Sequence, residues 1–363
     1  MILKRLQAAG DRRAATKLAA LLIVFAAPPF ILSGFASFEL TLVLVWAVAI
    51  VALNMQLGYT GQLSVGANVS FALGAYVTAI LSSTYEVPLL FAAIIAVITA
   101  STLGLLLGLL TAGLKDLYLA MATMALAVLA PQIVSRFPGV TGGDAGFIVS
   151  RPGPPEWLDV THDQYFYWLV FIVGLLVFLI VRNMVTGPMG RALRAIRDGE
   201  MVARTQGIKV VQIKAAVSCL SAGGIATSGC LYVMVVGIIS PKTIGLILSI
   251  NLIVALVVGG AASLSGALVG GLFLQFAPKV SSGIGAELGG ILFGLAVVIV
   301  VIAAPRGGAI LLASGWKRVV DRLSLRRGAR SVDPFGHVPV TGHQAPPLTT
   351  AGSRITGRTG RTP

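Results

Sequence analysis

Residues 40–57 of the chain read LTLVLVWAVAIVALNMQL, an apolar run without a single charged side chain. A helix rises about 1.5 Å per residue, so roughly 20 mostly apolar residues are needed to cross the hydrocarbon core of a bilayer. Such runs recur and predict ten membrane-spanning helices, at residues 18–37, 40–57, 67–82, 88–113, 117–137, 165–181, 213–236, 244–258, 263–276 and 289–304. The runs at 67–82, 244–258 and 263–276 are short and rich in small residues, which suits closely packed or broken helices.

The composition supports a membrane protein and excludes other classes. Hydrophobic residues make up 56% of the 363 residues and charged residues 11%, whereas soluble domains have roughly 45–50% and about 25%. Two cysteines cannot form a disulfide framework. The sequence therefore predicts an all-α, polytopic membrane protein whose membrane region covers residues 18–304. The first apolar run is interpreted as a retained span, because it is longer than the apolar core of a signal peptide.

The charges predict how the chain is oriented in the lipid bilayer. The formal net charge is +14, and the basic residues concentrate in an N-terminal arm (1–17), a loop (182–212) and a tail (305–363). Lys and Arg in short loops stay on the cytoplasmic side, so both termini are predicted to be cytoplasmic, in agreement with an even number of spans. The acidic loop 138–164 is then external, and the tail, which lacks apolar periodicity, is predicted to be disordered. The positive charge thus marks orientation and does not indicate a nucleic-acid partner.

Catalytic and metal-binding patterns are missing from the sequence. No charged residue or histidine lies near the middle of any predicted span, and the two cysteines lack the spacing of metal ligands. A proton-coupled carrier needs ionisable groups deep inside the membrane-spanning region, where the predicted spans lack them. Carriers that bind ions through backbone carbonyls are not excluded by this absence. The sequence contains no Walker A motif for binding ATP. We therefore expect neither an enzyme nor a bound metal or cofactor.

Glycine clusters in two segments between predicted spans, residues 58–66 (GYTGQLSVG) and 259–266 (GGAASLSG). Two interpretations stay open: tight turns at close helix contacts, or matching elements of an internal duplication that meet near a transport pathway. Polar groups in or beside spans are either hydrogen-bond partners between helices or pathway residues. The candidates for packing or pathway lining are Asn54, Gln56, Gly58, Gly61, Ser64, Gly66, Asn68, Ser70, Gly259, Gly260, Ser263 and Gly266.

The most informative cytoplasmic segment is residues 187–208, GPMGRALRAIRDGEMVARTQGI. Arginines recur every three residues at 191, 194 and 197, beside a small apolar face built mainly from alanine. Gly199 interrupts the pattern and Gly207 ends it, so the segment predicts two short amphipathic helices. An alanine face anchors weakly in lipid and is better suited to docking in a groove of another protein.

Several motifs together carry a resemblance to a known family. They are residues 53–64 (LNMQLGYTGQLS) with 72–76 (ALGAY), Thr141-Gly142-Gly143 with Gly146, 190–198 (GRALRAIRD), Ile239-Ser240-Pro241 and the turn 259–266. With these motifs in this order over most of the membrane region, the chain resembles the permeases of branched-chain amino-acid ABC transporters. Its long external loop with Thr-Gly-Gly is similar to that of the M-type subunit.

The resemblance implies a permease subunit in the bacterial inner membrane that forms half of a pathway for branched-chain amino acids. It implies an H-type permease subunit, two ATPase subunits and an extracytoplasmic substrate-binding protein as partners. The segment that matches the family's ATPase-contacting loop contains Gly190, Arg191, Ala192, Leu193, Arg194, Ala195, Ile196, Arg197, Asp198, Glu200 and Gly207.

The sequence departs from the family pattern at two places. Ala67 and Asn68 follow Gly66 where the family often has His, and Gly199 takes the place of Asn in the cytoplasmic loop. These differences leave the substrate open. The alternatives are a urea or amide permease of the same family, and a stand-alone secondary carrier or channel.

Overall fold

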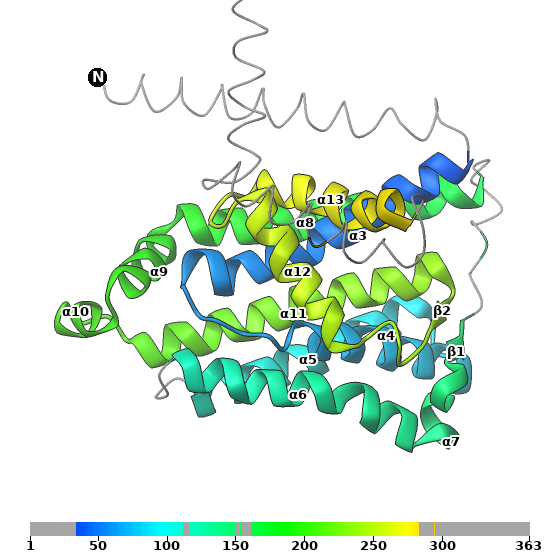
Figure 1. The fold of residues 1–363 in the computed structure, drawn as a ribbon, viewed down its shortest axis with the longest axis horizontal. Coiled ribbons are helices and arrows are strands. Elements are labelled where there is room, and N and C mark those ends of the chain that lie inside the picture. Colours follow the sequence, from blue (N-terminus) through cyan, green and yellow to red (C-terminus); the bar gives the residue numbers. More distant parts are fainter. Residues whose placement is uncertain (1–33, 112–115, 150–152, 154–160, 283–293, 295–363) are drawn as a thin grey trace, which may run out of the picture. The chain divides into compact units, whose positions relative to one another are not determined.

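The computed structural model describes residues 34–111, 116–149, 153, 161–282 and 294 (Figure 1). The long helices are α3 (Gly34–Asn54), α4 (Ala67–Thr84), α5 (Leu89–Thr111), α6 (Asp116–Arg136), α8 (His162–Thr186), α11 (Val210–Val236), α12 (Leu246–Gly259) and α13 (Gly266–Ser282). A π-helical turn, η1 (Met55–Tyr59), extends α3. The short elements are α7 (Pro138–Thr141), the 3-10 turn η2 (Gly143–Ala145), β1 (Phe147–Ile148), α9 (Pro188–Asp198), α10 (Glu200–Thr205) and β2 (Ile238–Ile239).

Helices in the described residues coincide with eight of the ten predicted spans. Within the part of the chain that the structure describes, five helices are long and apolar enough to cross a membrane, at Gly34–Tyr59, Leu89–Thr111, Tyr118–Arg136, His162–Thr186 and Val210–Val236. The three shorter predicted spans correspond to α4, α12 and α13. The first predicted span up to residue 33, the last one apart from residue 294, the N-terminal arm and the C-terminal tail lie outside the described residues. The helical, polytopic character is confirmed, and the count of ten stays a prediction.

One span boundary differs from the sequence prediction. Residues 34–37 were assigned to the first span, but they form the first turn of α3. The sequence between them and residue 40 contains Glu39, which was placed in an external turn. In the structure Glu39 is buried inside α3, where its carboxylate accepts hydrogen bonds from Gln275 and Lys279 of α13. Because the charge is paired, the helix continues through it.

Two helices form the centre of the described fold. In the apolar windows of α3 and α11, 78% and 67% of the residues are buried, against 17–22% in α5, α6 and α8. Helix α11 packs against α3, α4 and α5, and α3 packs against α8 and α13. The outer helices present apolar side chains such as Ile94, Met121 and Ile172 at their surfaces. Such faces suit contact with lipid or with another membrane subunit.

Small residues allow α11 to approach its neighbours closely. A Cβ atom at Gly74 of α4 would lie 2.1 Å from the carbonyl oxygen of Ala226 in α11. On the same interface, the rings of Trp46, Phe71 and Tyr232 lie 5.5–5.7 Å apart and join α3, α4 and α11. Lipid tails are as apolar as the helices, so close van der Waals packing is the main force that holds such helices together.

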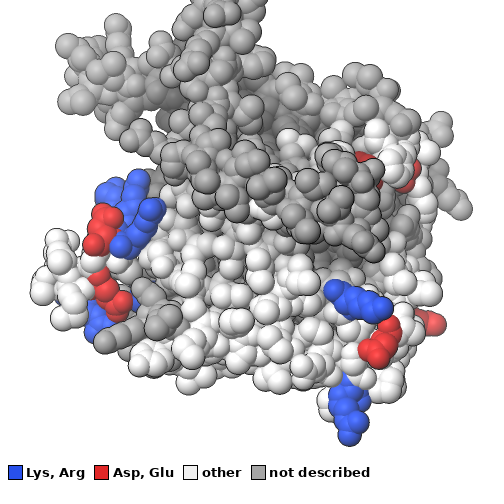
Figure 2. All heavy atoms as spheres, viewed as in Figure 1, with Lys and Arg blue, Asp and Glu red and all other residues white. Residues whose placement is uncertain are grey.

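The charged side chains lie toward the helix ends. Besides acidic side chains at the upper right, Figure 2 shows two groups with both charges, one over α9 and α10 and the other over the end of α6, with α7 and the strands nearby. At this second end, β1 pairs antiparallel with β2 through Phe147 opposite Ile239 and Ile148 opposite Ile238. The sequence predicted α9 and α10 to be cytoplasmic and this second end to be external.

The close contact at Gly74 yields a test of the packing. We expect Gly74→Ala to lower the free energy of unfolding by about 1–3 kcal/mol, because the new methyl group overlaps the Ala226 carbonyl. The measurement is the Tm of the purified protein in detergent. Gly139→Ala is the control, because no described atom lies within 4 Å of a Cβ there. An equal Tm for the two variants would contradict the packing described for α4 and α11.

Candidate functional site

The segment 187–208, which was predicted to be cytoplasmic, forms two short helices, as predicted. Helix α9 begins with Pro188 after Gly187 and ends at Asp198, and α10 follows after Gly199. Gly207, with a φ of +78°, stands after the end of α10, where the amide of Ile208 donates to the carbonyl of Ala203. This is the glycine stop that the sequence predicted. We call residues 188–205 the α9–α10 loop.

The apolar face of the α9–α10 loop is mostly turned toward its own chain. Leu193 and Ile196 are buried, and Ile196 packs with Ala203 and Val210. The sequence assigned this face to a groove of another protein, but periodicity alone does not distinguish an internal from an external contact. The large apolar side chains that remain at the surface of α10 are Met201, 76% exposed, and Val202, 60% exposed.

The loop starts at a very close contact with α8. A Cβ at Gly190 would lie 1.7 Å from the carbonyl oxygen of Val185, so only glycine fits there. Of the other residues in the predicted site, Arg191, Arg194, Arg197, Asp198 and Gly207 are exposed, and Ala192, Ala195 and Glu200 are half-buried. Most of the predicted site is therefore exposed or half-buried, as are Met201 and Val202 at the surface of α10.

Arg197 connects the loop to the first glycine segment. Its Nη1 donates a hydrogen bond of 2.7 Å to the carbonyl oxygen of Gly58 at the end of η1. Gly61, with a φ of +77°, packs its backbone against the same side chain, and a Cβ there would lie 3.3 Å from Arg197 Cγ. Arg194 instead donates to the carbonyl of Gly190 in its own helix, at 3.1 Å. Arg197 is therefore the arginine through which α9 contacts the membrane region.

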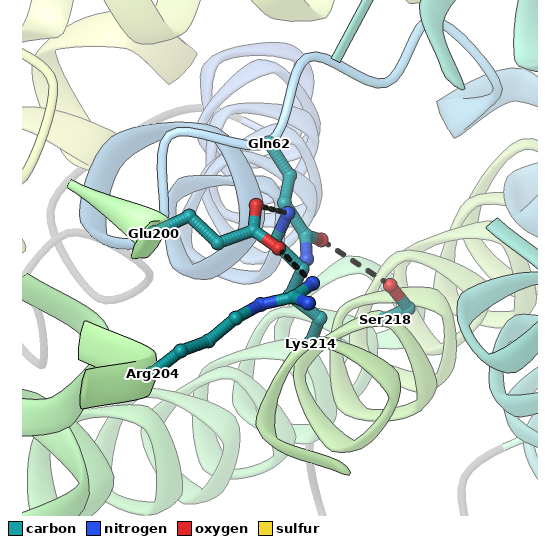
Figure 3. Close-up of polar contacts among 5 residues, drawn as sticks. All are labelled: Gln62, Glu200, Arg204, Lys214 and Ser218. Atoms are coloured by element: carbon teal, nitrogen blue, oxygen red, sulfur yellow. Dashed lines mark hydrogen bonds and ion pairs between the residues drawn. The ribbon is translucent and has the colours of Figure 1, made fainter. Parts of the chain in front are cut away.

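Glu200 makes a second connection, to α11 (Figure 3). Its carboxylate binds Arg204 Nη2 at 2.7 Å and Lys214 Nζ at 2.6 Å. The Lys214 side chain is only 6% exposed, against 49% for Arg204. Partial burial alone would raise the pKa of Glu200, but the hydrogen bonds and charges of Lys214 and Arg204 outweigh it and lower the pKa below 4.5.

The two glycine segments meet in the structure. The side-chain oxygen of Asn54 accepts from the amide of Ala262 at 2.8 Å, and its nitrogen donates to the carbonyl of Ser263 at 2.9 Å. A Cβ at Gly58 would lie 1.8 Å from Asn54 Oδ1, so the joint also requires glycine at that position. The predicted meeting of the segments is observed, and the internal duplication stays a prediction.

The second glycine turn is itself tightly closed. A Cβ at Gly259 would lie 2.1 Å from the carbonyl of Gly266, and Gly260, with a φ of +111°, caps α12 by donating to the carbonyls of Leu256 and Val257. The two hydrogen bonds that the Gly260 amide donates are 2.9 and 3.1 Å long. Gly259, Gly260, Ser263 and Gly266 therefore belong to a helix–turn–helix joint between α12 and α13.

Asn68 ties three helices together and is completely buried. Its amide nitrogen donates to the carbonyls of Ala127 in α6 and Ile244 before α12, at 2.8 and 2.9 Å. Its oxygen accepts from Ser249, whose hydroxyl also accepts from the Asn68 backbone. With these bonds made, Asn68 acts as a packing residue.

Four other candidates line a small cavity among α4, α5, α6 and α11. Gln56, Ser64, Gly66 and Ser70 face it, and Ser218 of α11 completes its polar part. The cavity measures about 40 Å³, which is room for a few waters and too little for an amino acid. Hydrogen bonds of 3.4 Å join Gln56 to Ser218 and Ser218 to Gln62. A substrate therefore does not fit in this cavity in this conformation.

Gln62, Lys214 and Ser218 were not among the site residues predicted from the sequence. One signal was present for Lys214: a lysine lies second in the apolar run predicted at 213–236, and a charge there needs a partner. Gln62 lies within the glycine segment 58–66, but nothing in the sequence indicated its contact with Ser218, which is 156 residues away.

Asn54 provides a test of the joint between the glycine segments. We expect Asn54→Leu to lower the free energy of unfolding by about 1–3 kcal/mol, because the Ala262 amide and Ser263 carbonyl lose their partner. Asn183→Leu is the matched control, because its side chain is exposed. Chemical denaturation of both variants in detergent checks this. Equal unfolding energies would contradict the role of the joint.

The lowered pKa of Glu200 predicts a pH dependence of stability. A carboxylate whose pKa is lower in the folded state stabilises the fold above its unfolded pKa, near 4.5, and loses that contribution as the pH falls through the folded value. The Tm advantage of the wild type over Glu200→Gln should therefore be constant at neutral pH and shrink below pH 4.5. An advantage that grows on acidification would contradict the ion pairs.

Comparisons with known proteins identify the family. The family model described as "Branched-chain amino acid transport system / permease component" matches residues 35–301. The chain is 24% identical to the high-affinity branched-chain amino acid transport system permease protein LivM of Escherichia coli, and 23% identical to that of Salmonella typhimurium. Each of these matches covers 80% of this chain and 73% of the relative.

A shorter match relates the chain to a second kind of permease. The LivH permease protein of Escherichia coli is 29% identical over 150 residues, which cover 41% of this chain and 48% of that protein. No solved structure matches the chain. The family match spans α3 to α13 and both glycine segments, and the match to LivM covers far more of the chain than the match to LivH. The chain belongs to the branched-chain amino-acid ABC transport permeases and is of the M type.

Proposed function

We propose that the chain is the M-type permease subunit of an ABC importer that carries branched-chain amino acids across the bacterial inner membrane. The observation that carries the proposal is the α9–α10 loop, which presents Met201 and Val202 outward. The same loop binds the membrane region through Arg197 and Glu200. A surface loop tied to two points of a helical membrane protein suits the transfer of movement from a partner.

The energy for transport comes from separate ATPase subunits. The chain has no Walker A motif and no charged residue near the middle of the described spans. Two ATPases would dock on α10 and on its counterpart in a second permease subunit, with the exposed apolar pair as the centre of the contact and the arginines of α9 at its rim. Closure of the ATPase dimer on ATP would then shift the loop and change which side of the membrane the pathway faces.

The substrate pathway forms between this chain and an H-type subunit. The cavity of about 40 Å³ is too small to hold an amino acid, whereas α5, α6 and α8 present long exposed faces. The relatives' printed names support branched-chain amino acids as substrates. Selection among them is the task of an extracytoplasmic binding protein, in keeping with the uncharged spans.

The test of this function is reconstitution in liposomes with an H-type subunit, two ATPases and a binding protein. ATP-dependent uptake of leucine, isoleucine or valine is the expected result. Uptake of urea or an amide, and not of these amino acids, would show that the substrate belongs to a different class. Uptake by the single chain without ATP would overturn the ABC assignment in favour of a stand-alone carrier or channel.

The exposed pair on α10 gives a specific prediction for docking. We expect Met201→Glu to reduce co-purification of the ATPase subunits by about tenfold or more, because a charge in the centre of an apolar contact loses its water without a partner. Val140→Glu is the matched control, because Val140 is 58% exposed on α7, at the opposite helix ends. ATPase binding by Met201→Glu at the level of the control would show that α10 is not the docking element.

A further inference from the structure

A series of polar residues, joined by side-chain contacts and by one turn of α11, leads from the α9–α10 loop to the cavity. Glu200 binds Lys214 in the second turn of α11. Ser218 stands one helical turn further along α11 and faces the cavity. The Ser218 hydroxyl contacts both Gln62 and Gln56, at 3.4 Å each. Figure 3 shows the contact of Glu200 with Lys214 and, beside it, that of Gln62 with Ser218.

The ion pair in this series is strongly constrained by burial. Lys214 is 6% exposed and Glu200 is 31% exposed, so the ammonium is inside the protein while its partner belongs to a surface helix. Removing one partner from such a pair leaves an uncompensated buried charge, which is costly. If α10 moves, Lys214 must therefore move with Glu200 or become hydrated. In both cases the first turns of α11 change.

The contacts at the inner end of the series are weak. The bonds between Gln56, Gln62 and Ser218 are long for hydrogen bonds with a hydroxyl. By contrast, Asn54 and Asn68 make bonds of 2.8–2.9 Å. The three loosely bonded residues come from two segments that both contact the loop, since η1 binds Arg197 and α11 binds Glu200. Such contacts can open at small cost when the two segments separate.

We propose that Glu200 and Lys214 are positioning residues that transmit movement of the α9–α10 loop to an inner gate formed by Gln56, Gln62 and Ser218. The proposal rests on the proposed function, because ATPase subunits must move the loop. When α10 shifts, Lys214 follows Glu200 and carries Ser218 away from the two glutamines. The cavity then opens toward α9 and α10, and its polar lining becomes accessible to water.

The experiment compares variants in the complete transporter, reconstituted in liposomes with all its partners. Uptake and ATP hydrolysis are measured in the same preparation, together with the amount of assembled complex. We expect uptake per ATP to fall by about tenfold or more in Glu200→Gln and Lys214→Met. Lys214→Met, which lies on α11 outside the docking loop, should hydrolyse ATP within about twofold of the wild type. The charge-swapped double variant Glu200→Lys with Lys214→Glu should recover a substantial part of the coupling.

Arg204→Gln is the matched control. Arg204 binds the same carboxylate, but it is half-exposed and lies on the same short helix as Glu200. It cannot transmit movement from α10 to α11, so we expect uptake per ATP within about twofold of the wild type, as for an exposed ion pair of small energy. Loss of coupling in this control equal to that in Glu200→Gln would overturn the role of Lys214.

A labelling experiment measures directly whether water-soluble reagents reach the gate. In a chain with Cys219→Ala and Cys230→Ala, Ser218→Cys reports access of a hydrophilic thiol reagent to the gate. Addition of ATP should change the labelling rate when Glu200 is present, and Glu200→Gln should abolish the change. An unchanged response in Glu200→Gln would overturn the proposal.

The remaining outcomes are distinguishable. If the variants lose uptake and ATP hydrolysis together, in proportion to the amount of assembled complex, the ion pair only stabilises the fold and the proposal is wrong. If the variants couple uptake to ATP like the wild type, the proposal is wrong as well. Failure of the proposed function is seen separately, because the unmodified transporter would then show no ATP-dependent uptake.

Discussion

The close approach of α11 to the helices around it is the constraint on which the described fold depends. Gly74 brings α4 against the backbone of α11, and Gly104 brings α5 to within 2.7 Å of the Ser218 carbonyl, measured from an added Cβ. In a membrane, apolar burial does not favour one helix contact over lipid, so the fit of backbones and small side chains decides which helices associate. Gly104 also lines the cavity next to Ser218.

Local sequence features could be predicted because they depend on neighbouring residues. The apolar runs, the break at Gly199 and the stop at Gly207 all follow from residues within one or two turns, and the structure confirms them. The face of α9 that would be buried could not be predicted, because Leu193 and Ile196 have the same periodicity whether they contact α10 or a partner. The position of Glu39 inside α3 depends on Gln275 and Lys279, more than 230 residues away.

The polar candidates divide according to how completely they are bonded. Asn54 and Asn68 each use both their oxygen and their nitrogen in short bonds to backbone or hydroxyl groups of other segments. Gln56 and Ser218 have long bonds and face the cavity. Both kinds look alike in the sequence as polar residues in apolar runs. Only the partners in space separate residues that hold helices together from residues that can change their contacts.

Helix α3 is attached to α13 near both of its ends. Asn54 binds the turn that begins α13, and Glu39 binds Gln275 and Lys279 near the end of α13, with Trp46 donating to Gln275 from between them. Two helices that are joined at both ends can neither slide past each other nor splay apart at one end. The pair therefore moves as one unit. Helix α11, which packs against α3 and carries Lys214 near its beginning, meets this unit as a separate element.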